Sequence, residues 1–249
     1  MLKEERFDHI LEALKEKEKV TYETLATDLK VSEDTILRDI DFLHHNGMLS
    51  KVRGGAILLS KNPLNFQDRT SHLSEGKQVI ALKAQQFIKS GMTVFMDGGT
   101  TNCTIAAHLP VDAKFRIVTN NMALIPVLAR FKNIELILLG GAYNRDTETN
   151  LGAKTCEEIG NYIADIYFLG ACAIQQQFGV TAAFAEEAAT KQAMLNAAKQ
   201  TIVLGNIEKL NSTEPFKVCG LEAISILITD LPGNDEQLNP YRNNGFKIV

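Results

Sequence analysis

The sequence predicts an α/β protein of two domains, in which an N-terminal winged helix-turn-helix precedes a larger domain with a mostly parallel sheet. Two patterns predict this fold: apolar residues at helical spacing recur through residues 1–60, and apolar runs alternate with helical stretches across residues 75–249. With 249 residues and a hydrophobic content of 45%, the chain can bury one small core and one of ordinary size. We expect a first domain at residues 1–60, a linker at 61–74 and a second domain at 75–249.

The first domain contains three short segments whose apolar side chains recur on one helical face. Ser32 is a favourable N-cap for the third segment, which follows the second after a tight connection at Lys30-Val31. This is the helix-turn-helix pattern, whose last helix enters the major groove of DNA, although a three-helix protein-docking module has the same period. The apolar positions are Phe7, Ile10, Leu11 and Leu14, then Tyr22, Leu25, Ala26 and Leu29, then Ile36, Ile40 and Leu43.

Residues 48–59, which follow these helices, favour the DNA interpretation. They predict a two-stranded wing with cations and bare glycine backbone at its tip, an arrangement that suits a phosphate contact. With Ile36 and Ile40 inside, the outward face of the third helix is left to contact bases. The candidate DNA-contacting residues are Ser32, Thr35, Leu37, Arg38, Lys51 and Arg53.

The charge balance argues against binding through bulk charge. The whole chain has a net charge of -4, and residues 1–60 carry 9 lysines and arginines against 12 acids. A DNA-binding domain usually has a basic footprint, which this one lacks. Any contact with DNA must therefore be local, and a sensor that acts through protein contacts stays open as an interpretation.

The second domain contains six apolar runs, each followed by a small or polar residue. Between them lie helical stretches such as 78–87, 123–129 and 187–198, so the pattern is a βα repeat with helices on both faces of the sheet. In such an open sheet the carboxyl ends of the strands form one crevice, where ligands bind. The runs are 94–96, 117–118, 136–139, 167–169, 202–204 and 226–228.

We place the functional centre at residues 94–102, where an apolar run breaks into an acid, two glycines and two hydroxyls. Glycines let backbone amides turn outward before a helix, and amides at a helix N-terminus attract phosphate. An ordinary strand-to-helix turn capped by Thr100 or Thr101 would have the same sequence pattern. The amides, hydroxyls and a lysine of the crevice suit a small polyhydroxylated anion. The candidate effector-binding residues are Asp97, Gly98, Gly99, Thr100, Thr101, Thr119, Asn120, Gly140, Gly141 and Lys209.

Other chemistry is not indicated. Lys191 is four residues after Glu187, a spacing that predicts a surface ion pair rather than a ligand contact. The four cysteines are far apart and lack metal-ligand spacing, so we expect reduced thiols, no metal and a cytoplasmic protein. No dinucleotide or Walker motif occurs, and neither a secretion signal nor a membrane-spanning run is present, so we expect no cofactor and no membrane contact.

The motifs taken together resemble the DeoR family of bacterial regulators of sugar metabolism. Residues 31–40, with Gly47, Lys51 and residues 53–56, are similar to the family's DNA-binding domain. The resemblance implies an effector domain with a fold similar to ribose-5-phosphate isomerase, which senses sugar phosphates. Two departures are Leu37, where the family usually has an arginine, and Asn206, where it tends to have an acid. The linker matches at residues 66–69, and the second domain matches at residues 97–101, 119–121, 139–141, 168–171 and 228–230, and at Lys191 and Lys209.

From these features we expect a cytoplasmic transcriptional regulator, a repressor of a carbohydrate-utilisation operon, that binds operator DNA under the control of a phosphorylated sugar. Paired half-sites on DNA imply a homo-oligomer, either a dimer or a tetramer. The main alternative is a sugar-phosphate isomerase, which needs a carboxylate base over the substrate. Asp97, Asp165 and Glu186 are the acids available for that role, and none has a distinctive motif beside it, so we expect no catalytic residue.

Overall fold

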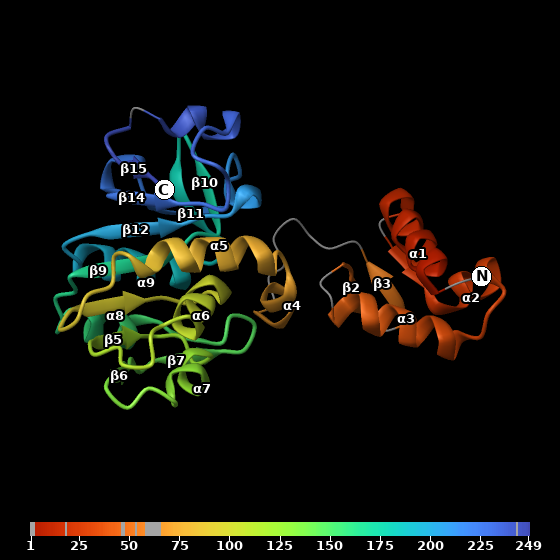
Figure 1. Cartoon of the computed structure of the whole chain (residues 1–249), viewed down its shortest axis with the longest axis horizontal. Helices are drawn as coiled ribbons and strands as arrows, with labels where there is room; N and C mark the ends of the chain where they lie inside the picture. Colours follow the sequence, from red (N-terminus) through yellow and green to blue (C-terminus); the bar gives the residue numbers. More distant parts are fainter. Residues whose placement is uncertain (1–2, 18, 46–47, 53, 58–65, 243) are drawn as a thin grey trace. The chain divides into compact units, whose positions relative to one another are not determined.

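A computed structural model describes residues 3–17, 19–45, 48–52, 54–57, 66–242 and 244–249. The chain divides into two compact units, Met1–Ser74 and Glu75–Val249 (Figure 1). Among the described residues, no helix has both the length and the apolar character needed to cross a membrane.

The N-terminal unit is a winged helix-turn-helix, as the sequence predicts. Its helices are α1 (Lys3–Lys17), α2 (Tyr22–Leu29) and α3 (Glu33–His45), and nine buried side chains, Leu25, Ile36 and Leu43 among them, form its core. The side chain of Thr21 caps α2, and Ser32 caps α3 by accepting a hydrogen bond from the amide of Thr35. The chain turns between α2 and α3 at Lys30, whose φ of 54° ends the helix in the left-handed conformation.

The two strands predicted for the wing are present, and a third strand that was not predicted joins their sheet. Strands β2 (Ser50–Val52) and β3 (Gly55–Ile57) form the expected hairpin, and β1 (Lys19–Thr21) pairs with the other edge of β3. Because β1 has only three residues between two helices, its sequence shows no alternation that would reveal it. The helix α4 (Phe66–Ser71) lies within the segment expected to be the linker. Residues 61–65 of that segment, Pro63 included, are outside the described residues.

The C-terminal unit is built on a seven-stranded sheet in the order β15-β14-β12-β9-β4-β5-β6, in which every neighbouring pair is parallel (Figure 1). All six predicted apolar runs are strands of this sheet, and only the short edge strand β15 was not predicted. The strands are β4 (Thr93–Met96), β5 (Arg116–Thr119), β6 (Glu135–Leu138), β9 (Ile166–Gly170), β12 (Thr201–Leu204), β14 (Ile226–Ile228) and β15 (Lys247–Ile248).

Alternate residues of the strands enter two separate cores. Val94 and Met96 pack with side chains of α5 (Ser74–Gln85), α6 (Thr100–Ala107) and α7 (Leu124–Leu128). Phe95 points to the other face, where α8 (Ala153–Ile159) and α9 (Ala185–Asn196) pack. Burial on both faces explains why the strand sequences are continuously apolar.

Two smaller sheets were not predicted. One is the hairpin of β7 (Ala142–Asn144) and β8 (Thr149–Leu151), and the other joins β10 (Ala173–Gln175), β11 (Gly179–Ala182) and β13 (Phe216–Cys219). The remaining short elements are the 3-10 helices η1 (Ile207–Lys209), η2 (Leu221–Ala223) and η3 (Glu236–Tyr241).

The order of the large sheet fixes where a ligand site is expected. From β4 the chain adds β5 and β6 on one side, then returns to add β9, β12 and β14 on the other. The order therefore reverses between β4 and β9, and open α/β sheets bind ligands outside the carboxyl ends of the strands at such a point. Asp97 directly follows β4, and Gly170 ends β9.

Candidate functional site

The carboxyl ends of β4 and β9 are joined by a buried ionic cluster of Asp97, Lys191 and Glu187. Asp97 Oδ2 accepts hydrogen bonds from Lys191 Nζ at 2.7 Å and from the Tyr167 hydroxyl at 2.6 Å. Asp97 Oδ1 accepts from the amide of Gly170 at 3.0 Å and from Asn102 Nδ2 at 2.9 Å. Four donors therefore occupy this carboxylate, and its geometry favours a positioning role over direct contact with an effector.

Lys191 is the charge that balances this site, and the expectation of a surface ion pair is wrong. Its side chain is on α9 and only 1% exposed, and Nζ also contacts the carbonyl oxygen of Gly170 at 2.8 Å and Glu187 Oε1 at 3.4 Å. Burial lowers the pKa of Lys191, but Asp97 and Glu187 more than offset this and raise it above its usual value. Burial also raises the pKa of Asp97, against the opposing effect of Lys191.

A small pocket lies beside this cluster, under the β7–β8 hairpin. Asp97, Gly98 and Asn120, three of the predicted effector residues, line it together with Thr149, Leu151, Glu187, Thr190 and Lys191. The amide of Asn150 donates to the carbonyl oxygen of Asn120 at 2.8 Å, and Asn120 Nδ2 returns a bond to the carbonyl of Asn150 at 2.9 Å. These bonds tie the hairpin to the end of β5. The pocket has a volume of about 10 Å³, roughly the space of one water molecule.

The other predicted effector residues surround the pocket without lining it. Gly99 is the N-cap of α6, with the half-buried Thr101 and the buried Thr100 in its first turn. The hydroxyl of Thr119 donates to the carbonyl of Met96, so it holds β5 to β4. Lys209 is half-buried in η1 and is not among the pocket residues.

Gly140 and Gly141 face α8 instead of the pocket. The amide of Gly140 donates to Glu158 Oε2 at 2.7 Å, and its carbonyl accepts from the Thr155 hydroxyl at 2.7 Å. Gly141 has a φ of 138°, and a Cβ atom there would lie 2.1 Å from the same hydroxyl. Both glycines therefore serve close packing of the loop on α8, which gives them a structural reason to be glycine.

Sequence reasoning missed Thr149, Leu151, Glu187 and Thr190 as pocket residues. The spacing of Glu187 and Lys191 placed them on one face of a helix, but spacing alone does not show that this face is buried against Asp97. Thr149 and Leu151 belong to the unpredicted hairpin, whose short polar sequence carries no strand signal.

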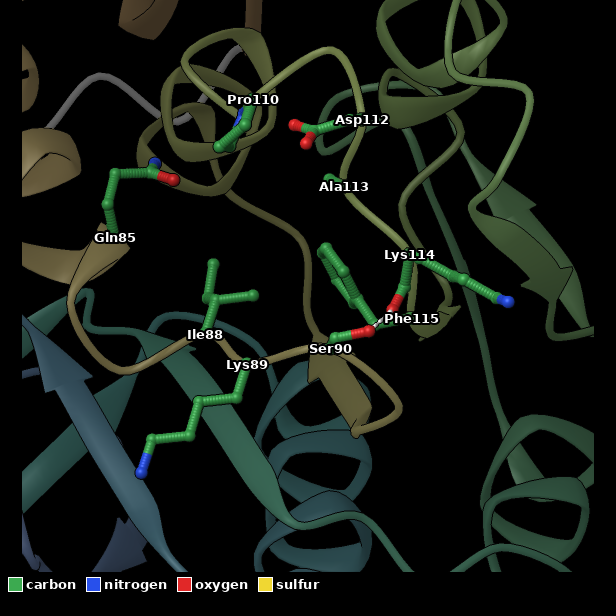
Figure 2. Close-up of a pocket in the computed structure, with 9 residues that line it drawn as sticks. All are labelled: Gln85, Ile88, Lys89, Ser90, Pro110, Asp112, Ala113, Lys114 and Phe115. Carbon is green, nitrogen blue, oxygen red and sulfur yellow. Dashed lines mark hydrogen bonds between the residues drawn. The ribbon is translucent and has the colours of Figure 1, made fainter.

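A larger hollow of about 340 Å³ lies at the opposite, amino-terminal edge of β4 and β5 (Figure 2). Ile88, Pro110 and Phe115 face it, whereas the amino groups of Lys89 and Lys114 point away from it. None of the predicted site residues lines this hollow, and no residue that lines it has a buried polar side-chain atom left without a partner. Among the described residues, no group of three His, Cys, Asp or Glu side chains is placed to hold a metal ion.

The candidate DNA-contacting residues lie on α3 and the wing of the N-terminal unit. Arg38 is exposed and has no polar partner among the residues that the structure describes, and Leu37 is half-buried. Lys51 forms an ion pair with Asp41 of α3, and the hydrogen bond to Asp41 raises the pKa of Lys51. The hydroxyls of Ser32 and Thr35 lie 2.9 Å apart at the start of α3. Arg53 lies outside the described residues.

Two family models match the chain. A model described as the DeoR-like helix-turn-helix domain matches residues 6–62. A second, described as the DeoR C terminal sensor domain, matches residues 73–231. The first match falls in the N-terminal unit and the second covers most of the C-terminal unit.

Curated proteins are similar over nearly the whole chain. The HTH-type transcriptional repressor GlcR of Bacillus subtilis (strain 168) is 33% identical over 252 residues, which cover 100% of this chain and 96% of that protein. The glycerol-3-phosphate regulon repressor of Escherichia coli (strain K12) is 27% identical over 93% of this chain and 92% of its own length. Among solved structures, ribose 5-phosphate isomerase A from Methanocaldococcus jannaschii aligns with 54% of its chain and 55% of this one, at 15% identity and a TM-score of 0.41, a likeness too weak to support a functional argument.

Proposed function

The chain belongs to the DeoR family of transcriptional regulators, and from this premise we propose that it represses a carbohydrate-utilisation operon in the cytoplasm under the control of a phosphorylated sugar. The observation that carries the proposal is the presence of both family domains in one chain, with a pocket at the point where the sheet order reverses in the sensor domain. We propose that a homodimer or homotetramer binds paired half-sites of operator DNA.

The DNA contacts are proposed for α3 and the wing. Arg38 is the exposed cation of α3 and is proposed to contact bases, whereas Lys51 is proposed to hold a phosphate after exchanging Asp41 for DNA. Ser32, Thr35, Leu37 and Arg53 complete the proposed interface, with Leu37 suited to a thymine methyl group. In a gel shift on DNA upstream of the protein's own operon, Arg38→Ala is expected to cost about 1–3 kcal/mol and to relax sequence preference. Unchanged binding by both Arg38→Ala and Lys51→Ala would contradict this interface.

The effector is proposed to bind across the end of β4, with its phosphate at the start of α6. There the backbone of Gly99, Thr100 and Thr101 forms a helix N-terminus, which favours an anion. Lys209 is proposed to add positive charge. Calorimetric titration with pentose and hexose phosphates tests this, followed by gel shifts with each sugar phosphate that binds. A binding sugar phosphate that leaves operator affinity unchanged would contradict the coupled mechanism.

We propose that the sensor domain has no isomerase activity. Asp97 is occupied by four donors, and Asp165 accepts from the amide of Thr93, which begins β4, so it lies at the edge opposite the pocket. Glu186 is exposed and is not a pocket residue. None of these three acids thus presents a carboxylate that is ready to remove a substrate proton, and Glu187, the other acid of the pocket, is held through Oε1 by Lys191 and by the Cys172 thiol. Turnover of any sugar phosphate by the pure protein would overturn this part of the proposal.

A further inference from the structure

The pocket at the end of β4 contains a buried hydrogen-bond acceptor that no protein group satisfies. Asn120 is 2% exposed, and its Nδ2 donates to the carbonyl oxygen of Asn150, which fixes the orientation of the side-chain amide. Its Oδ1 is buried and has no partner. A buried carbonyl oxygen without a donor is costly, so this atom requires a donor from outside the protein, either a water molecule or a ligand.

Glu187 supplies a second acceptor in the same pocket. It is 8% exposed in the first turn of α9, and both of its polar contacts, with Lys191 Nζ and the Cys172 thiol, go through Oε1. Its Oε2 has no polar partner among the residues that the structure describes.

The side-chain donors that line the pocket are already engaged within the protein. Lys191 Nζ contacts three oxygen atoms, which matches the three protons of an ammonium group. The Thr190 hydroxyl donates to the carbonyl of Glu186, and the hydroxyl of Thr149 is hydrogen-bonded to that of Thr147. The unsatisfied side-chain groups of this pocket are therefore acceptors, and a molecule that fits them must bring donors.

The charge of the cluster argues against a phosphate group beside Glu187. Asp97, Glu187 and Lys191 together carry one excess negative charge when all three are ionised, and they are at most 8% exposed. A phosphate placed against Glu187 Oε2 would meet a like charge in a poorly solvated site. Hydroxyl groups are neutral and can donate, so they suit this position.

We propose that Asn120 and Glu187 determine the effector's sugar specificity by accepting hydrogen bonds from two of its hydroxyl groups. This inference rests on the proposed function and refines it, because it separates a polyol end at Asn120 and Glu187 from a phosphate end at the start of α6. It also assigns a binding role to Glu187, which is hydrogen-bonded to the thiol of Cys172.

The test is calorimetric titration of the full-length protein with pentose and hexose phosphates, each alongside its monodeoxy derivatives. For the wild type, removal of a hydroxyl that meets Glu187 is expected to weaken binding by roughly 10- to 100-fold, the range for a hydrogen bond to a charged group. Glu187→Gln is expected to reduce this discrimination between the sugar phosphate and its deoxy derivative. The ratio matters because a variant that merely loosened the pocket would weaken both compounds alike.

Matched variants separate the outcomes. Glu186→Gln changes the adjacent, exposed acid and is expected to keep the wild-type ratio. Asn120→Ala is expected to lose discrimination at a different hydroxyl and provides a second test if Glu187→Gln does not fold. Unchanged ratios in both pocket variants would overturn the inference while leaving the proposed function standing. Failure of every sugar phosphate to bind the wild type would overturn both.

Discussion

At the residue scale, the ionic cluster of Asp97, Lys191 and Glu187 holds the carboxyl ends of β4 and β9 in place. Burial removes water from all three charges of the cluster, so each charge is tolerated only while its oppositely charged partner is present. Lys191→Met would leave Asp97 and Glu187 buried without a counter-charge, so we expect a loss of about 3–5 kcal/mol in the free energy of unfolding, measured by urea denaturation. The double variant Asp97→Asn with Lys191→Met should be more stable than Lys191→Met alone, and the absence of that rescue would contradict the proposed charge balance.

Gly98 is the second residue whose identity the structure explains. A Cβ atom at Gly98 would lie 2.3 Å from Thr149 Cγ2, so alanine would collide with the hairpin above the pocket. We expect Gly98→Ala to cost about 1–3 kcal/mol in stability and to weaken effector binding, measured by thermal unfolding and calorimetry. Thr149→Ser removes the colliding methyl group but keeps the hydroxyl, so the double variant should recover much of both losses. A fully stable Gly98→Ala protein would mean that the hairpin gives way easily.

At the element scale, the wing and α3 are linked by the ion pair of Lys51 with Asp41, and at the proposed interface Asp41 would compete with DNA for the lysine. Asp41→Asn releases Lys51 and removes a negative charge from the helix that is proposed to contact DNA. An exposed ion pair contributes up to about 1 kcal/mol, so operator binding should tighten by up to about five-fold. The slope of log affinity against log salt should stay near the wild-type value, because Lys51 is proposed to contact the same phosphate in both complexes. Gel shifts at several salt concentrations measure both, and Asp34→Asn, an exposed acid on the same helix, is the control.

Asp165 links the amino ends of two central strands, and its contribution should depend on pH. A hydrogen bond from Lys199, at 2.8 Å, and one from the amide of Thr93 lower the pKa of Asp165. A lowered folded-state pKa means that the stabilisation is complete above the unfolded-chain pKa of about 4 and is lost as the pH falls through the folded value. Asp165→Asn should therefore be less stable at neutral pH and should lose less stability on acidification. Urea unfolding across pH 2 to 7 tests this, and parallel curves for the two proteins would contradict it.

The same elements show how far sequence reasoning reaches. The strand run at Val94, Phe95 and Met96 could be predicted because burial on both faces leaves an unbroken apolar signature. The β7–β8 hairpin could not, because three-residue strands with polar side chains have no measurable period. The pairing of Lys191 with Asp97 joins residues 94 positions apart, and no local pattern encodes such a contact. The strand-to-helix turn at residues 97–101 could be predicted from the sequence, but which of its atoms remain available to a ligand depends on tertiary contacts.

At the scale of the whole molecule, the two units have separate cores, since the cluster that contains Ile36 includes no described residue beyond position 56. A fragment of residues 75–249 should therefore fold alone and bind the same sugar phosphate as the full chain, without binding operator DNA. Circular dichroism, calorimetry and gel shifts of the purified fragment test this expectation. A fragment that is unfolded, while the intact protein binds the sugar phosphate, would show that the sensor depends on the N-terminal unit.

The central position of β4 has a consequence for synthesis on the ribosome. This strand pairs with β5, which follows it closely, and with β9, which is translated about 70 residues later. The middle of the sheet cannot close until Gly170 has left the exit tunnel, by which time residues up to 57 can have folded, because domains fold in order of emergence. A chain terminated early within the second unit would thus contain a folded winged helix-turn-helix without a folded sensor domain. Premature stop codons in this region are expected to yield repressors that ignore the sugar, instead of inert fragments, if single heads retain enough affinity for the operator.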